Sequence, residues 1–164
     1  MDGEFEKLKP LMPSVECNTT AAREHVSEAE RTIRTLKERM RGLVATLPFE
    51  YIPRRMKIEF IYFMVLWMNA FRVKSGISRT FSPRELMVHW ALDYKKHCRV
   101  APGTYCEVHD EPTPTNMMAP RTHEAIALGP TGNLQGSVKF YCLNTGRVLK
   151  RRSFTAMPMP TRVI

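Results

Sequence analysis

The feature that most constrains this fold is an amphipathic stretch at residues 23–47. Its apolar side chains recur every three or four positions, at Val26, Ala29, Ile33, Leu36, Met40, Leu43 and Leu47. This spacing places them on one face of an α-helix. Thr19 and Thr20 can cap the start of the helix. Pro48 ends it, because the residue before a proline is pushed out of the helical region. The sequence therefore predicts one long helix with a single buried face.

Charged side chains gather beside this apolar face. At about 100° per residue, one acidic side chain, Glu30, lies within roughly 40° of four basic ones, which are Arg23, Arg34, Lys37 and Arg41. Such a column suits an anionic polymer, and its carboxylate is of a kind that holds a divalent metal. A solvated helix with ion pairs four residues apart, such as Glu30 with Arg34, explains the same pattern. Periodicity alone favours this second interpretation.

Charge and composition narrow the class of partner. The 164 residues carry a formal charge of +9, and 43% of them are apolar. This is enough apolar content for a core, and the charge points to a polyanion such as nucleic acid, although a membrane surface stays possible on charge alone.

Features of the termini, apolar runs and cysteines indicate the compartment. The chain opens on acidic residues, whereas a signal peptide needs a basic start and an apolar run. The apolar run at residues 60–68 is too short to span a bilayer. Four cysteines without a CxxC pair indicate reduced thiols. We therefore expect a nuclear or cytoplasmic protein with no membrane partner.

Two further helices and four strands complete the expected α+β fold. The second helix spans residues 54–74 and is apolar on every side at residues 60–68, so we expect other elements to surround it. The third begins at the capping box Ser82-Pro83-Arg84-Glu85 and ends near Trp90. Strands are predicted at residues 104–109, 124–128, 138–143 and 147–154, and Asn144-Thr145-Gly146 joins the last two as a hairpin. Short strands at this spacing favour a small antiparallel barrel. The expected domains are a helical part at residues 1–92 and a barrel at 99–156, followed by an irregular tail at 157–164.

Three groups of side chains are candidates for chemistry. The carboxylates of Asp2 and Glu30 would hold Mg²⁺ for phosphoryl transfer if folding brings them together. A second group, at His97, Cys98, Cys106 and His109, has zinc ligand types in a spacing that matches no standard zinc motif. Structural thiols and surface imidazoles are the favoured interpretation of this second group.

The third group is basic and lies on the predicted hairpin, at Lys139, Arg147, Lys150, Arg151 and Arg152. Successive side chains of a strand point to opposite faces, so these five cannot share one flat patch. Phosphate binding explains them, and so does the protection of an edge strand by charge. The sequence leaves these two explanations level.

Four short motifs occur in one order along the chain: Asp2-Gly3-Glu4-Phe5, Glu30-Arg31-Thr32-Ile33-Arg34-Thr35-Leu36, Leu66-Trp67-Met68-Asn69 and Phe81-Ser82-Pro83-Arg84-Glu85-Leu86. In this order they resemble segments of retrotransposon and retroviral integrases, with the copia type most similar. The matching segments are the acidic turn with the second catalytic aspartate, the glutamate that opens a long helix, an apolar helix ending in asparagine, and a proline-containing helix start. The segment Leu143-Asn144-Thr145-Gly146-Arg147-Val148-Leu149 resembles the small barrel that follows the copia-type core, so the resemblance covers nearly the whole chain.

The resemblance implies the remnant of an RNase H-like core, with two long helices and a short third, followed by a small antiparallel SH3-like β-barrel. It also implies two-metal strand transfer on DNA ends, with Glu30 and Asp2 as catalytic ligands of Mg²⁺ or Mn²⁺. The same resemblance implies that Arg34, Lys37 and Arg41 are candidate phosphate contacts and that the barrel is a DNA-binding module.

The chain departs from the family pattern in three places. The family's first catalytic aspartate would precede Met1. The interval between Asp2 and Glu30 is shorter than is usual for the family, and His25-Val26-Ser27-Glu28 replaces its Asn-Gly loop. A two-metal site without one of its ligands positions its ions wrongly. We therefore expect this chain to lack strand-transfer activity on its own.

The leading hypothesis is thus an integrase-derived fragment that serves DNA integration as part of a larger polyprotein. Its partners would be DNA, other integrase subunits or the rest of the polyprotein. Two alternatives stay open. One is a domesticated nucleic-acid-binding protein without catalysis, and the other is a helical interaction protein whose charge serves only solubility.

Overall fold

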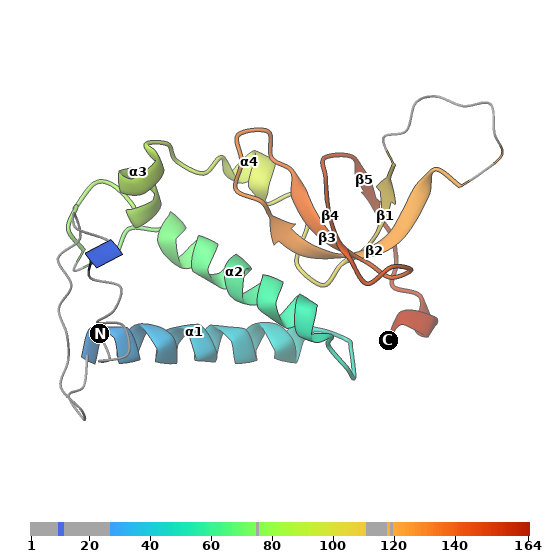
Figure 1. Cartoon of the computed structure of the whole chain (residues 1–164), viewed down its shortest axis with the longest axis horizontal. Helices are drawn as coiled ribbons and strands as arrows, with labels where there is room; N and C mark the ends of the chain where they lie inside the picture. Colours follow the sequence, from blue (N-terminus) through green and yellow to red (C-terminus); the bar gives the residue numbers. More distant parts are fainter. Residues whose placement is uncertain (1–9, 12–26, 75, 111–117, 119) are drawn as a thin grey trace. The chain divides into compact units, whose positions relative to one another are not determined.

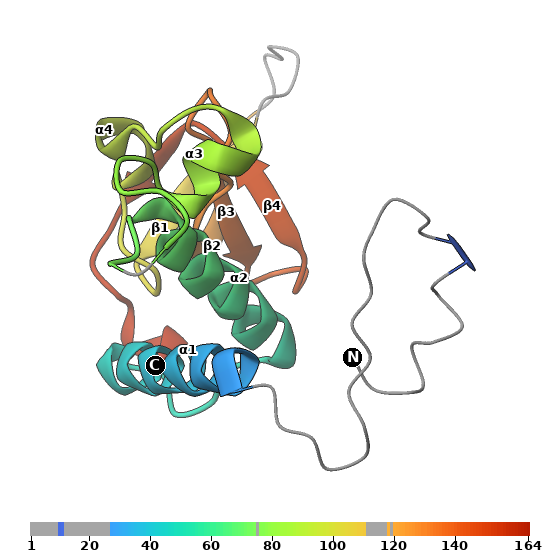
Figure 2. The same ribbon diagram turned by 90° about the vertical axis from the view of Figure 1, so that its left-hand side faces the viewer.

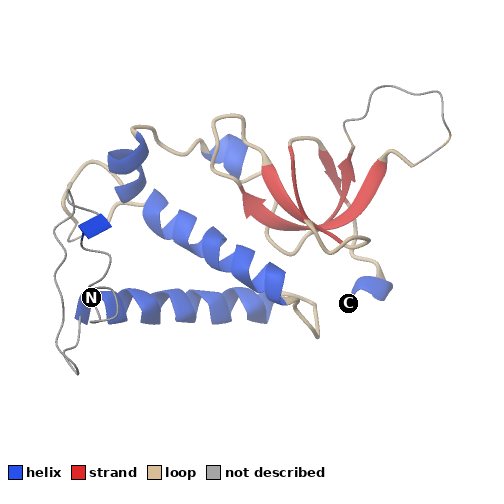
Figure 3. Ribbon diagram, in the orientation of Figure 1, coloured by secondary structure: helices blue, strands red, loops and turns tan. Residues whose placement is uncertain are grey.

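Helices occupy the first part of the chain and strands the second (Figure 3). The computed structural model describes residues 10–11, 27–74, 76–110, 118 and 120–164. The chain divides into two units, Met1–Arg39 and Met40–Ile164. Within the described residues, four helices precede a five-stranded antiparallel sheet, which confirms the α+β class.

The long helix predicted first is α1 (Ser27–Thr46), and its predicted start at residues 23–26 lies outside the described residues. In the Met40–Ile164 unit, its last turns contribute Met40 and Leu43, which pack together with Leu47 against a buried cluster. None of the helical residues is itself fully buried. The predicted buried face is therefore only partly buried among the described residues, and the helix ends just before Pro48 as expected.

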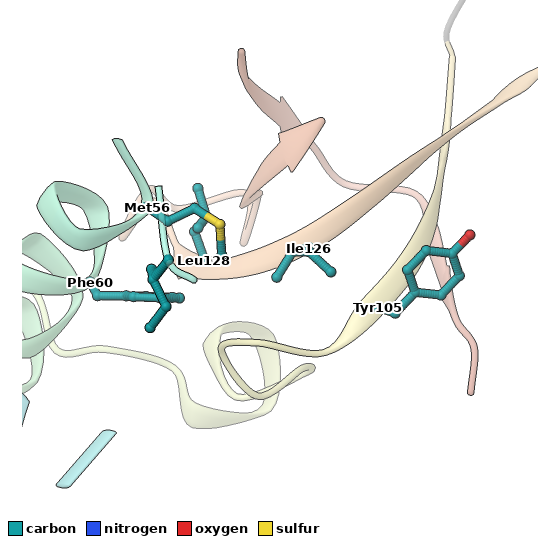
Figure 4. Close-up of a cluster of buried hydrophobic side chains, with 6 residues drawn as sticks. Met56, Phe60, Tyr105, Ile126 and Leu128 are labelled. Atoms are coloured by element: carbon teal, nitrogen blue, oxygen red, sulfur yellow. The ribbon is translucent and has the colours of Figure 1, made fainter. Parts of the chain in front are cut away.

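The second helix, α2 (Arg54–Ala70), is buried along one side only. Its Met56 and Phe60 pack against Ile126 and Leu128 of the sheet (Figure 4). Four other apolar side chains, three or four positions apart, remain exposed: Ile58, Ile61, Tyr62 and Val65. The prediction that other elements surround α2 is therefore wrong, because the sheet covers one face of it.

The third helix begins at the predicted capping box. Ser82 Oγ accepts a hydrogen bond from the Glu85 backbone N–H at 3.2 Å, and Glu85 Oε2 accepts one from the Ser82 backbone N–H at 2.6 Å. The helix that follows, α3 (Pro83–Val88), lies over the C-terminal end of α2 (Figure 2). It ends before the predicted Trp90, because His89 adopts a left-handed conformation with φ 61°. A fourth helix, α4 (Tyr94–His97), was not predicted.

The five strands are β1 (Tyr105–His109), β2 (Thr122–Pro130), β3 (Val138–Cys142), β4 (Val148–Arg151) and β5 (Phe154–Ala156). They pair in the order β4-β3-β2-β1-β5 (Figure 1). The prediction of a single strand at residues 147–154 is therefore wrong. This segment is divided between the two edges of the sheet, since β4 pairs with β3 and β5 pairs with β1. Arg152 and Ser153 connect them, and we call this pair of residues the crossing.

The sheet curls strongly. The rings of Phe140 on β3 and Phe154 on β5 have centroids 5.1 Å apart. Two strands separate β3 from β5 in the sheet, and neighbouring strands lie about 4.8 Å apart, so a flat sheet would hold these two positions roughly 14 Å apart. The concave face therefore closes around Phe140 and Phe154.

Both faces of the sheet are buried, which explains why residues 125–130 of β2 show no exposed position. Tyr105, Ile126 and Leu128 pack with α2 on one face. The concave face holds the second cluster, Cys106, Val108, Ala125, Ala127, Val138 and Phe140. Val148 packs against the first cluster and Leu149 against the second, as strand alternation predicts.

Two remaining findings concern the tail and the helices. The tail predicted to be irregular contains a 3-10 turn, η2 (Thr161–Val163), and its Val163 packs against the first cluster. No helix in the described part of the chain is long and apolar enough to cross a membrane.

Candidate nucleic-acid interface

A cavity of about 500 Å³ opens where α4, the loop between β2 and β3, and the crossing meet. We call it the basic groove, because four of its eight lining residues are cationic. The lining consists of Lys95, Lys96, Arg99, Gln135, Gly136, Arg152, Ser153 and Phe154. None of these eight described residues is acidic.

Two of the four cations come from α4. Asp93 caps this short helix, because its Oδ1 accepts a hydrogen bond from the Lys95 backbone N–H at 3.0 Å. The other carboxylate oxygen lies 3.6 Å from Lys96 Nζ, with the two side chains 46% and 57% exposed. An ion pair this exposed contributes little, roughly 0–1 kcal/mol, so the lysine can exchange it for a phosphate.

The third cation, Arg99, is held by groups that carry no charge. Its Nη1 donates a hydrogen bond to the carbonyl oxygen of Arg152 at 2.9 Å. Its guanidinium carbon lies 4.7 Å from the centre of the Phe154 ring. These contacts orient Arg99 while leaving its positive charge unneutralised by either of them. Arg152, the fourth cation, is exposed at the crossing.

Gly136 allows the loop to approach α4. Its φ is +71°, and a Cβ at this position would lie 2.9 Å from Lys96 Cβ and 3.2 Å from the Lys96 carbonyl oxygen. The loop is also braced from within, because Asn133 Oδ1 accepts a hydrogen bond from the Ser137 backbone N–H at 3.0 Å. The shape of the groove therefore depends on a close backbone contact that a larger residue would disturb.

The five basic residues predicted on the hairpin do not come together. Lys139 Nζ lies 2.7 Å from Glu59 Oε2, with the side chains 24% and 15% exposed. Arg151 Nη2 lies 3.6 Å from Asp110 Oδ1. Arg147 and Lys150 are exposed, and neither lines the basic groove. Of this predicted set, Arg152 alone lines the groove.

The predicted residues of α1 do not line the basic groove. Glu30, Arg34, Lys37 and Arg41 are all exposed, and the first three belong to the Met1–Arg39 unit, whereas Arg41 belongs to the other. Asp2 lies outside the described residues. Among those residues, no three His, Cys, Asp or Glu side chains gather closely enough to hold a metal ion. Because Asp2 is not among them, the Mg²⁺ or Mn²⁺ site that the resemblance implies for Asp2 and Glu30 stays a prediction.

The four residues of the candidate zinc group, His97, Cys98, Cys106 and His109, also lie in different environments. His97 is buried, so the expectation of a surface imidazole is wrong at this position. His109 Nε2 lies 3.3 Å from Thr155 Oγ1. Cys98 is an exposed free thiol, whereas Cys106 is buried and its burial raises the pKa of the thiol to about 11. The interpretation of Cys106 as a structural thiol agrees with this environment.

Sequence reasoning missed three of the four groove cations, Lys95, Lys96 and Arg99. A signal was present, since three cations occur within five positions after Tyr94. The expected domain limits leave Lys95 and Lys96 between the helical part and the barrel, and they make Arg99 the first residue of the barrel.

No protein-family model, curated protein or solved structure matches this chain.

Proposed function

We propose that this protein binds nucleic acid, with DNA as the expected partner, through the basic groove of the Met40–Ile164 unit. The observation that carries the proposal is the convergence of Lys95, Lys96, Arg99 and Arg152 on one cavity lined by no acidic residue. A phosphodiester backbone supplies a row of single negative charges that such a groove can follow. The formal charge of +9 adds a long-range attraction for the same polyanion.

The proposed origin is a copia-type integrase, of which this chain would contain an RNase H-like remnant and an SH3-like barrel. Three observations support it. The order α1, α2, α3 and the capping box at Ser82 follow the order of the family's segments. The last strand of a curled antiparallel meander returns to pair with the first, as in a small closed barrel. The loop between β2 and β3 of this barrel-like part, where the resemblance expects DNA binding, forms one side of the groove.

We propose binding and not catalysis for this chain. The basic groove supports binding, because its described lining holds four cations and no carboxylate that could hold a metal ion. Purified protein incubated with a labelled DNA end and target DNA in Mg²⁺ or Mn²⁺ should yield no joined product. Joined product that disappears in the Glu30→Gln variant would contradict this part of the proposal.

Fluorescence anisotropy with a labelled DNA duplex tests binding directly. The groove variant carries Lys95→Gln, Lys96→Gln and Arg152→Gln, which are exposed positions. A matched control carries Arg54→Gln, Arg55→Gln and Arg79→Gln, which are also exposed and lie outside the groove lining. Both variants lose three positive charges, so they share any effect of net charge.

The expected loss of affinity follows from counterion release. Each phosphate contact changes the logarithm of the binding constant by about 0.9 per tenfold change in salt. Removing three contacts should therefore weaken binding at about 0.1 M salt by on the order of 10²-fold or more, whereas the control should change it only a few-fold. Equal losses in the two variants would show that net charge, and not the groove, attracts DNA.

A second candidate function is self-association, which is favoured by the exposed side of α2. Apolar side chains there and on α3 are between 38% and 81% exposed: Ile58, Ile61, Tyr62, Val65, Leu86, Met87 and Val88. They form a patch on the order of several hundred Å², near the roughly 800 Å² per partner of a stable interface. Helical spacing of three and four residues lets a second copy pack its own α2 against this stripe around a two-fold axis.

Light scattering after size-exclusion chromatography tests this second candidate. We expect wild-type dimers, and monomers for an Ile61→Glu, Val65→Glu variant. The control is Ala45→Glu, an exposed position of α1 outside the stripe. A monomeric wild-type protein at all concentrations tested would rule the candidate out.

A further inference from the structure

Three aromatic side chains meet where α2 ends and α4 begins. The ring centroids of Trp67, Phe71 and Tyr94 lie 6.1–6.2 Å apart in each pair, and their planes differ by 14–27°. We call these three rings the aromatic platform. Phe71 is 53% exposed and Tyr94 is 49% exposed, so water reaches about half of each side chain. Nearly parallel rings with open surface favour stacking with a further flat aromatic group.

An apolar cavity of about 470 Å³ adjoins the platform. Trp67 and Phe71 line it together with Phe63, one turn earlier on α2, and with residues 97, 98 and 100–102. The Phe63 and Trp67 rings meet edge to face, with centroids 6.1 Å apart. None of these eight lining residues is a lysine, arginine, aspartate or glutamate. The cavity therefore suits a flat, uncharged group better than a charged one.

The short helix α4 connects the aromatic platform to the basic groove. Tyr94, its first residue, belongs to the platform, and the next two residues, Lys95 and Lys96, line the groove. At 1.5 Å per residue, Tyr94 and Lys96 are only about 3 Å apart along the helix axis. Arg99 also lines the groove, whereas the residues on either side of it line the apolar cavity. One segment therefore supplies cations to the groove and apolar groups to the cavity.

A single strand of nucleic acid presents the two complementary kinds of group. Each nucleotide carries one phosphate charge and one flat base. In a duplex, the faces of the bases are covered by stacking, whereas the bases of a single strand can turn outward and stack on aromatic side chains. Proteins that bind single strands combine a cationic groove with such side chains. The platform beside the basic groove is this combination, which a duplex would leave unused.

We propose that the aromatic platform stacks with unpaired bases of a DNA strand whose phosphates lie in the basic groove, so that the protein holds single-stranded DNA. The proposal rests on the proposed function of the groove and adds the class of DNA bound beside α4. The phosphates contact Lys95 and Lys96, and the bases stack on Phe71 and Tyr94. Every base has a flat face, so this contact selects unpaired DNA without selecting its sequence.

Two oligonucleotides with the same backbone test the proposal on the wild-type protein. One is a single strand of thymidines, and the other has the same number of phosphates and the same label but abasic sugars throughout. Losing one stacked base weakens binding by roughly 5- to 150-fold. We therefore expect fluorescence anisotropy to show at least about fivefold weaker binding to the abasic strand. Equal affinity for the two strands would overturn the proposal.

A pair of variants locates the contact. The platform variant carries Phe71→Leu and Tyr94→Leu, which remove two rings and keep apolar side chains. Its matched control carries Tyr51→Leu and Phe81→Leu, which are exposed positions outside the basic groove and the apolar cavity.

The platform variant should bind the thymidine strand at least about fivefold more weakly than the wild type, whereas the control should bind it equally well. Both variants should bind the abasic strand and a duplex as the wild type does, which also shows that they fold. Wild-type affinity of the platform variant for the thymidine strand would contradict stacking on these rings.

Salt dependence distinguishes the platform from the groove. For single strands, each phosphate contact changes the logarithm of the binding constant by about 0.7 per tenfold change in salt. The groove variant, with Lys95→Gln, Lys96→Gln and Arg152→Gln, should therefore lower this slope by about 2. The platform variant changes no charge and should keep the wild-type slope. A lower slope in the platform variant would show that its loss comes from disturbed cations, and would overturn the stacking role.

The outcomes separate the two proposals. If the wild type binds both strands equally and the groove variant binds both weakly, the groove stands and the platform fails. If the groove variant keeps the wild-type affinity and slope, the proposed function of the groove fails, and the comparison of the two strands still decides whether bases are bound. If the wild type binds neither strand, both proposals fail.

Discussion

Replacing Lys139 with glutamine distinguishes two roles for this side chain: a contact to DNA phosphate and an ion pair that stabilises the fold. The sequence pattern included Lys139 among the phosphate contacts, whereas the structure places its Nζ 2.7 Å from Glu59 Oε2 and 5.4 Å from the centre of the Tyr62 ring. With the side chains 24% and 15% exposed, the pair is intermediate between a surface ion pair and a buried one. Surface pairs contribute about 0–1 kcal/mol, and breaking a buried pair costs about 3–5 kcal/mol. We therefore expect Glu59 and Lys139 to be coupled by roughly 1–2 kcal/mol.

Urea denaturation of four proteins measures this coupling: wild type, Glu59→Gln, Lys139→Gln and the double variant. Each single variant should lower the free energy of unfolding, and the double variant should lower it by less than the sum, since both charges are then gone. DNA affinity gives the second readout. Lys139→Gln should change it less than about twofold, whereas Lys96→Gln should weaken it about eightfold at about 0.1 M salt. Additive losses of stability together with equal losses of affinity would refute the structural role of Lys139.

Three further predictions concern backbone and titrating groups. Gly136→Ala should lower the free energy of unfolding, measured in urea, by roughly 1–3 kcal/mol and should weaken DNA binding, because the φ of Gly136 is +71° and the added Cβ would approach Lys96 Cβ to 2.9 Å. The control Gly42→Ala lies in open space on α1 and should stabilise the protein by up to about 1 kcal/mol in the same titration. Ser82→Ala should lower the free energy of unfolding by about 1 kcal/mol, because the helix cap is lost. The hydrogen bonds from Ser82 lower the pKa of Glu85 below its usual 4.5, so the stability that this carboxylate contributes is present above pH 4.5 and should be lost as the pH falls below it. Acid titration of the wild type and the variant would detect this loss. Burial raises the pKa of the Cys106 thiol from 9.0 to about 11, so the contribution of this thiol to stability should be constant below pH 9 and fall as the pH rises from 9 towards 11. A thiol reagent at pH 8 should label Cys98 but not Cys106 in the native protein.

The elements that could be predicted from the sequence have local causes. The capping box at Ser82 involves residues three positions apart, and the end of α1 depends on the adjacent Pro48. The hairpin turn likewise closes through a hydrogen bond from the Gly146 backbone N–H to the Cys142 carbonyl oxygen at 2.9 Å. In each case, the residues that decide the conformation are neighbours in the chain.

The features that could not be predicted depend on distant residues. The partner of Lys139 lies 80 positions earlier in the sequence, and Arg99 contacts the Arg152 carbonyl across 53 positions. The division between β4 and β5 follows from the pairing of Phe154–Ala156 with β1, which no pattern within residues 147–154 reveals. The groove also joins distant parts of the chain, because Lys95 and Lys96 lie on α4, Arg99 follows that helix, and Arg152 lies in the crossing.

The pairing of β5 with β1 has a consequence during synthesis. Cys106 pairs with Ala156, about fifty positions later in the chain. At about 5–20 residues per second, a ribosome needs roughly 2.5–10 s to make that interval. Throughout this time, β1 has an open edge that invites pairing with other chains. Crowded nascent copies should therefore be most prone to aggregate before Phe154–Ala156 emerge, and a chain stalled before the crossing would keep that exposed edge.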